Sequence, residues 1–128
     1  MLNYILVACG GAIGSVARFW ANEMFASRFG QSFPWVTLVV NVTGAVAIGT
    51  VAGAARVSGG VFADPLFRDL VVVGVLGGYT TVSSFSLQTL NLMLDGQYRE
   101  ASFNAGLSAG LTVIAVGIGF WPVVRLFG

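Results

Sequence analysis

Four long apolar stretches separated by short polar segments limit what this chain can fold into more than any other feature. They run from about residue 2 to 21, 35 to 55, 67 to 94 and 101 to 127. A helix needs roughly 20 mainly apolar residues to cross a bilayer, and each stretch reaches that length. We therefore expect residues 1–128 to form a single all-α membrane domain with four transmembrane helices.

The composition excludes several classes of function. Hydrophobic residues make up 56% of the chain and charged residues 9%, against about 25% charged in soluble domains. A net charge of +1 argues against nucleic acid as a partner, because phosphate binding needs a concentrated basic face. The chain has no His and a single cysteine, Cys9, so it offers no side-chain metal cluster and no base to activate a nucleophile. We do not expect an enzyme.

The six basic residues, all arginines, are evenly divided between the two sides of the membrane. The expected helices place Arg56, Arg68 and Arg125 on the N-terminal side, and Arg18, Arg28 and Arg99 on the other. Since Lys and Arg near helix ends set orientation, three against three predicts insertion both ways round and an antiparallel homodimer. Such a dimer supplies the symmetry that many transporters obtain from inverted repeats. The plainer alternative is that a bias was never needed.

The third stretch carries glycines and hydroxyls at its centre, in the run from Gly77 to Ser86. Gly77-Gly78-Tyr79-Thr80-Thr81 is a poor helix centre, so we expect the third helix to be broken at Gly77–Thr81. A break inside a bilayer is tolerated only where other groups replace the lost hydrogen bonds. A cation ringed by the freed carbonyl oxygens is one solution, and a purely structural kink is the alternative.

Two further groups of polar residues lie inside the apolar stretches. Asn41 is near the middle of the second, and Asn104, Ser108 and Thr112 recur every four residues in the fourth, which places them on one helix face. Each has a structural explanation, through an interhelical hydrogen bond of about 0.6 kcal/mol or a hydroxyl bonded to its own helix. As neutral donors, together with the positive edges of aromatic rings, they suit a small anion that passes through weak serial sites.

With these residues the chain resembles the Fluc/CrcB family of small dual-topology fluoride channels. The likeness covers the four stretches, the motif Thr37-Leu-Val-Val-Asn41, and the run from Gly77 to Ser86. It implies an antiparallel homodimer with two pores lined by both subunits. It also implies a multi-pass protein of the bacterial cytoplasmic (inner) membrane that lets fluoride leave the cell passively.

The resemblance also assigns roles to individual residues. Asn41 looks like the pore-lining amide, Phe85 like one of the phenylalanines whose ring edges face fluoride, and Ser108 and Thr112 like the polar track. Gly77 and Thr80 match the positions whose backbone carbonyls hold a central structural Na+. Arg18 matches a structural arginine near the end of the first helix.

The chain departs from the family pattern at three positions. Val82 stands where family members carry a second Phe, Asn104 where an aromatic track residue can occur, and Gln88 where Glu is common. We expect Val82 and Asn104 to line the pore, with one ring of each pair missing and a more polar track. The missing ring leaves open a heterodimeric fluoride channel in which a homologous chain supplies it.

Two functions of other classes compete with the channel. One is a small dual-topology multidrug/proton antiporter, which requires a membrane-embedded Glu in the first helix, whereas residues 2–17 contain none. The other is a noncatalytic assembly subunit, which close helix packing allows but which needs no polar stripe.

Overall fold

Helices form most of the described chain, which comprises residues 1–29 and 34–128 in this computed structural model. Three of them are long: α1 (Leu2–Phe29), α2 (Trp35–Ser58) and α7 (Tyr98–Phe127). Between α2 and α7 the chain forms α3 (Gly60–Ala63), α4 (Pro65–Phe67), the π-helical segment η1 (Arg68–Leu76), α5 (Gly77–Tyr79) and α6 (Val82–Leu94). The four expected membrane spans are present, as Leu2–Arg28, Trp35–Ser58, Pro65–Leu94 and Tyr98–Phe127.

The helices run past the ends of the apolar stretches. α1 continues to Phe29 instead of ending near residue 21, and α7 begins at Tyr98 instead of near residue 101. Polar side chains alone do not end a helix, and residues 22–29 contain neither Gly nor Pro. The rest of the expected connection, residues 30–33, lies outside the described residues.

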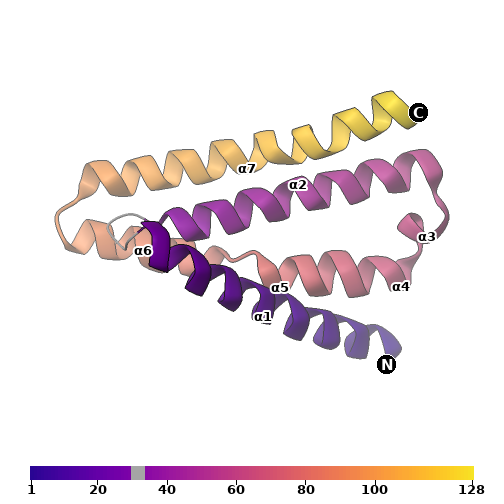
Figure 1. Cartoon of the computed structure of the whole chain (residues 1–128), viewed down its shortest axis with the longest axis horizontal. Helices are drawn as coiled ribbons and strands as arrows, with labels where there is room; N and C mark the ends of the chain where they lie inside the picture. Colours follow the sequence, from indigo (N-terminus) through magenta and orange to yellow (C-terminus); the bar gives the residue numbers. More distant parts are fainter. Residues whose placement is uncertain (30–33) are drawn as a thin grey trace.

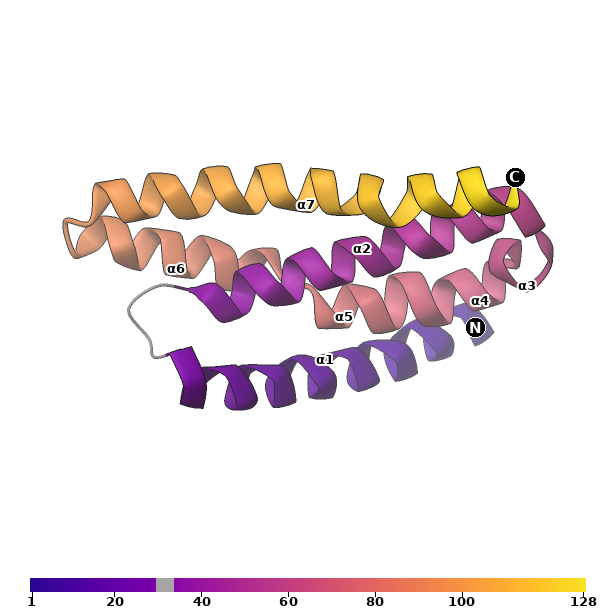
Figure 2. The same ribbon diagram turned by 45° about the horizontal axis from the view of Figure 1, so that its top comes forward.

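The spans lie side by side as two packed pairs (Figures 1 and 2). α2 packs along α7, and α1 packs along η1 and α5, while α6 packs against α7. Both termini lie at the same end of the molecule (Figure 1), as four consecutive crossings require. This arrangement brings the middle of α2, the middle of α7 and the junction between α5 and α6 together.

Glycines allow the paired spans to approach closely. A Cβ added to Gly74 of η1 would lie 2.9 Å from the Cα of Gly10 in α1, and one added to Gly119 of α7 would lie 2.8 Å from the amide nitrogen of Thr50 in α2. Small residues have this role in membrane helix packing, where burial from water no longer drives association. A Cβ added to Gly106 of α7, by contrast, would meet no atom of residues 1–29 or 34–128 within 4 Å outside the neighbouring turns of its own helix.

The third span is broken, but over fewer residues than expected. Thr80 and Thr81 are extended, with φ and ψ of −78° and 159° for Thr80 and −153° and 124° for Thr81. Gly77 and Gly78, which we expected to belong to the break, are helical in α5. A Cβ on Gly78 would lie 2.5 Å from the carbonyl oxygen of Gly11, so this glycine serves the contact with α1 and the two threonines alone form the break.

Candidate functional site

The side chain of Asn41 on α2 meets the break in the third span. Its Nδ2 donates to the Thr81 carbonyl oxygen at 3.0 Å, and its Oδ1 accepts from the Thr81 backbone N–H at 2.8 Å. The amide therefore pairs with both backbone groups of one extended residue. In a bilayer interior, where water cannot satisfy such groups, this pairing replaces hydrogen bonds that the helix has lost.

Thr81 also starts the helix that follows the break. It is the N-cap of α6, and its hydroxyl oxygen accepts from the Ser84 N–H at 3.2 Å. The same oxygen lies 3.2 Å from the hydroxyl oxygens of Ser83 and Ser84. The sequence carried a signal for this role, since Thr is among the preferred N-cap residues, but the site prediction did not include Thr81.

A groove with a volume of about 340 Å³ runs along the surface between α2, the break with the start of α6, and α7. It contains five of the six predicted pore residues and one of the two predicted sodium ligands. Its lining consists of Asn41, Ala45, Ile48, Thr80, Thr81, Val82, Phe85, Ser108, Ala109, Thr112 and Val116. The fold thus brings polar residues from three separate spans into one continuous surface.

Val82 and Phe85 form the α6 wall of this groove. Three residues apart, they lie on the same face of the helix. Val82 is 77% exposed, whereas Phe85 is half-buried. Phe85 therefore offers its ring to the groove from a packed position, and Val82 stands at the open side of the groove with no ring to offer.

The polar stripe on α7 divides into two parts. Ser108 and Thr112 line the groove, and Thr112 Oγ1 donates to its own helix, at 2.6 Å from the Ser108 carbonyl oxygen. Asn104 is only 2% exposed and is not part of the groove lining. Its Nδ2 donates instead to Thr89 Oγ1 on α6 at 2.9 Å, so Asn104 joins α7 to α6. Thr89, which the sequence did not single out, is its partner.

Gln88, the third departure from the family pattern, lies on α6 next to Thr89. Its Oε1 is buried and has no hydrogen-bond partner within residues 1–29 and 34–128. A buried acceptor without a donor costs about 1–3 kcal/mol. This atom therefore still requires a donor from outside the described chain.

The break leaves two backbone carbonyls without their helical donors. Thr81 N–H, which would donate to Gly77 in an uninterrupted helix, donates to Asn41, and Ser84 N–H, which would donate to Thr80, donates to the Thr81 hydroxyl. Carbonyl oxygens are suitable ligands for Na+. The Thr80 oxygen also accepts from Arg18 Nη1 at 3.4 Å, which leaves it one lone pair for a further ligand. By the chemistry of their oxygens, these two carbonyls fit a monovalent cation.

Arg18 lies deeper than the sequence suggested. Its contact with Thr80 places it midway along the third span, Pro65–Leu94, and not at the end of a helix. α1 continues for a further 11 residues, to Phe29. Arg18 is therefore a half-buried intramembrane cation, and backbone carbonyls are among the partners that such a group requires.

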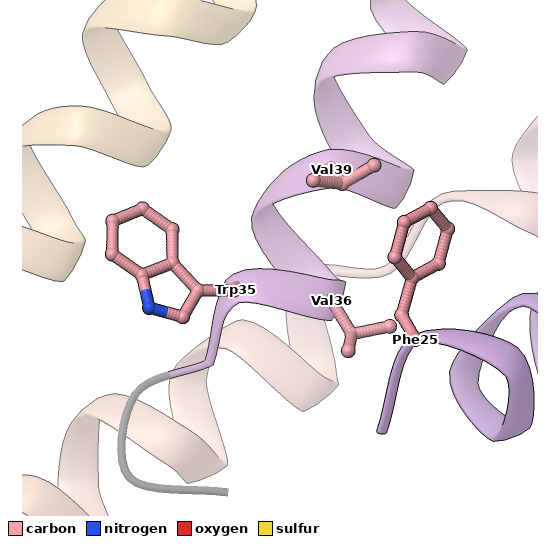
Figure 3. A pocket seen from close by; sticks show the side chains of 4 residues that line it. All are labelled: Phe25, Trp35, Val36 and Val39. Atoms are coloured by element: carbon pink, nitrogen blue, oxygen red, sulfur yellow. The ribbon is translucent and has the colours of Figure 1, made fainter. Parts of the chain in front are cut away.

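A second pocket, of about 220 Å³, lies where the end of α1 approaches the start of α2. Figure 3 shows its four lining side chains, Phe25 from α1 and Trp35, Val36 and Val39 from the first turns of α2. All four are apolar except for the indole N–H. This pocket offers an ion none of the donors that line the groove.

Comparison with known proteins finds one matching family and several similar proteins. Residues 5–120 match the family described as CrcB-like protein, Camphor Resistance (CrcB). The chain is 53% identical over 120 residues to the fluoride-specific ion channel FluC 4 of Brucella abortus, covering 94% of this chain and 90% of that one. It is 47% identical over 118 residues to the fluoride-specific ion channel FluC of Rhodospirillum rubrum, covering 92% of each.

Proposed function

The chain belongs to the CrcB family, and we infer that it is a fluoride-specific ion channel. It is a multi-pass membrane protein and not an enzyme, and in bacteria its place is the inner membrane. One observation carries the inference: a single groove gathers an amide, several hydroxyls and an aromatic ring from three spans. These groups lie at the depth of the break, where a hydrated anion needs substitutes for water.

We propose that the groove is the wall of the fluoride pathway. Its lining residues include no charged side chain. Asn41, Ser108 and Phe85 present neutral donors or ring edges, which attract an anion weakly. Conduction needs sites strong enough for the ion to enter and weak enough for it to leave. A row of neutral donors meets both requirements, whereas a fixed cation would hold fluoride.

We propose that a second copy of the chain, in the opposite orientation, covers the groove. Val82 lines the groove and is 77% exposed in a single copy, so the groove is open on that side. Lipid there would offer no partners to the polar groups of the groove. Gln88 Oε1 also lacks a donor within the described residues. An antiparallel homodimer contains two grooves and forms two pores, each lined by both subunits.

The arginine distribution supports this dual topology. Arg56, Arg68 and Arg125 lie at the end with the termini, and Arg28 and Arg99 lie at the other. Arg18 contacts the break and is removed from the count. The difference between the two ends is a single arginine, which is a weak signal for one orientation.

We propose further that a structural Na+ sits at the centre of the dimer, held by the carbonyl oxygens of Gly77 and Thr80 from both subunits. The support is that side chains have withdrawn the N–H groups that would close a helix on these two oxygens. The ion would join the two subunits by coordinating carbonyl oxygens of both. These oxygens are available only because the helix is broken. In this role Na+ fixes the dimer and takes no part in transport.

The proposed physiological task is passive export. Fluoride enters cells as neutral HF, ionises inside, and leaves through the channel down its electrochemical gradient. A multidrug/proton antiporter lacks support, because residues 2–17 contain no Glu and the first acidic residue of α1 is Glu23. The residues that line the groove likewise include no carboxylate.

Ion efflux from liposomes tests the proposal. Vesicles containing the purified dimer and loaded with fluoride should release it rapidly, while vesicles loaded with chloride should release no more than protein-free vesicles. Absence of fluoride efflux from a folded dimer would rule out the homodimeric channel. The heterodimer alternative is favoured by the missing ring at Val82. It predicts no fluoride efflux from this chain alone and fluoride efflux once a homologous chain is added.

A further inference from the structure

The two side chains that form the break act on two particular carbonyls. The Thr80 N–H still donates to the Leu76 carbonyl at 2.9 Å, so the helical hydrogen-bond pattern holds as far as Thr80. At the next residue it stops, because Thr81 N–H donates to Asn41 Oδ1 at 2.8 Å. The Gly77 carbonyl, four residues earlier, is the first to lose its helical donor.

The second backbone N–H that donates to a side chain instead of to a helical carbonyl belongs to Ser84, three residues further on. Ser84 N–H donates to Thr81 Oγ1 at 3.2 Å, as expected for an N-cap, and the Thr80 carbonyl loses the donor that a continuous helix would supply. The Thr80 oxygen instead lies 3.4 Å from the guanidinium of Arg18. Two side chains thus take the helical donors of the Gly77 and Thr80 carbonyls, and the Thr80 oxygen accepts from Arg18 instead.

We propose that Asn41 and Thr81 are the positioning residues of the cation site at the break. Asn41 takes the helical donor of the Gly77 carbonyl and Thr81 takes that of the Thr80 carbonyl, so that each oxygen, Thr80 beside its bond from Arg18, keeps a lone pair for Na+. This inference rests on the sodium site of the proposed function. It gives Asn41 a second task beside lining the groove, since its amide is bonded at both ends to the backbone of Thr81.

The same amide then connects the pore to the dimer centre. Asn41 lines the groove with one face and holds Thr81 with its oxygen and one N–H. Losing this side chain lets the Thr81 N–H return to the Gly77 carbonyl and close the helix by one residue. The cation then loses a ligand, whereas an amide that served only the anion could be removed without any effect on the cation.

The test is the rise in the thermal unfolding temperature of the purified dimer when N-methylglucamine is replaced by saturating Na+. A ligand that binds only the folded state stabilises that state by mass action. We expect Asn41→Leu to lose most of the wild-type rise. We expect Asn41→Asp to keep it, because either form of a carboxyl group retains an oxygen that accepts from Thr81 N–H. Both variants should lose fluoride efflux, the second because a negative charge repels the anion.

Thr81 provides an independent pair of variants. Thr81→Ser retains the capping hydroxyl and should retain the rise with Na+, while Thr81→Val removes the hydroxyl and should lose most of it. Ser108→Ala is the matched control, since Ser108 lines the same groove but forms its hydrogen bonds with Asn104 and Thr112 of its own helix. Its rise with Na+ should equal that of the wild type. Should Asn41→Leu fail to fold, the Asp, Ser and Val variants decide the question.

Two results would overturn the inference. If Asn41→Leu and Thr81→Val retain the full rise with Na+, these residues do not position the carbonyls, although the sodium site itself stands. If the wild-type dimer shows no rise with Na+ yet conducts fluoride, the inference falls together with the sodium site, and the channel assignment is unaffected.

Discussion

Asn104 of α7 donates from Nδ2 to Oγ1 of Thr89 on α6 over 2.9 Å. Thr89 in turn donates to the carbonyl oxygen of Phe85 at 2.8 Å. A chain of two hydrogen bonds therefore connects the buried face of α7 to the turn of α6 that carries the groove's aromatic ring. Asn104, which we expected from the sequence to line the pore, therefore joins the two helices that form these walls of the groove.

A double-mutant cycle tests the coupling between these two residues. We expect Asn104→Ala to lower the free energy of unfolding by about 1–3 kcal/mol, because it leaves Thr89 without its donor at a buried site. The interaction energy with Thr89→Ala should be about 0.6 kcal/mol or more. It is measured by reversible unfolding in detergent. Strictly additive losses would show that the two residues do not interact. Ser27→Ala, which removes a hydroxyl bonded to its own helix, is the neutral control.

Replacing Phe85 by Ile tests the role of the ring edge. The change keeps an apolar side chain in the groove but removes the polarised edge, whose loss should cut fluoride efflux about tenfold, equivalent to about 1.4 kcal/mol. Phe127→Ile, at the 73% exposed end of α7, should conduct like the wild type. Equal rates for all three proteins would remove the ring from the mechanism.

Introducing a ring at Val82 tests whether that position belongs to the pore. Val82 lines the groove and is 77% exposed, so Val82→Phe has room for the larger side chain within one subunit. We expect fluoride efflux from liposomes to rise or to stay unchanged. Val113→Phe makes the same change at a 74% exposed position of α7 outside the groove and should leave efflux unaltered. A Val82→Phe dimer that folds but conducts less would contradict the prediction.

A methyl group at Gly74 should disrupt the contact between the first and third spans. The added Cβ would lie 2.9 Å from Gly10 Cα, and backbone atoms cannot move aside cheaply. We expect Gly74→Ala to cost about 1–3 kcal/mol of unfolding free energy. Gly117→Ala meets only a Trp121 side-chain atom at 3.8 Å, so it should be neutral or stabilising by up to about 1 kcal/mol. A neutral Gly74→Ala would show that the two helices lie further apart.

Reporter fusions test the dual topology. Enzymes that are active on only one side of the membrane, attached after Gly128, should report both locations in the same cells. One added arginine near Arg56 should then shift the population toward the orientation with the termini in the cytoplasm, because it widens the difference between the two ends from one arginine to two. Exclusive labelling on one side in the unmodified chain would exclude the antiparallel homodimer.

The sequence alone determined the parts of this protein that depend on local composition. Four spans followed from the length of the apolar stretches, because a bilayer accepts few other structures. The break was also predicted from its Gly and Thr residues, and Asn41 and Ser108 were singled out as polar groups inside apolar stretches, whereas Phe85 was identified through the family resemblance. These features require no knowledge of which helices touch.

The partners of those residues were decided only by the tertiary structure. Periodicity placed Asn104 on the same face as Ser108, but only the packing of α6 on α7 turned it toward Thr89 instead of the groove. The two glycines looked like the break itself, yet contact with Gly11 keeps Gly78 helical. The helical hydrogen bonds of the third span stop at Thr81, because its N–H donates to Asn41, which is 40 residues away in the chain. Hydrogen bonds between distant segments depend on which spans pack together, and an apolar pattern does not specify that choice.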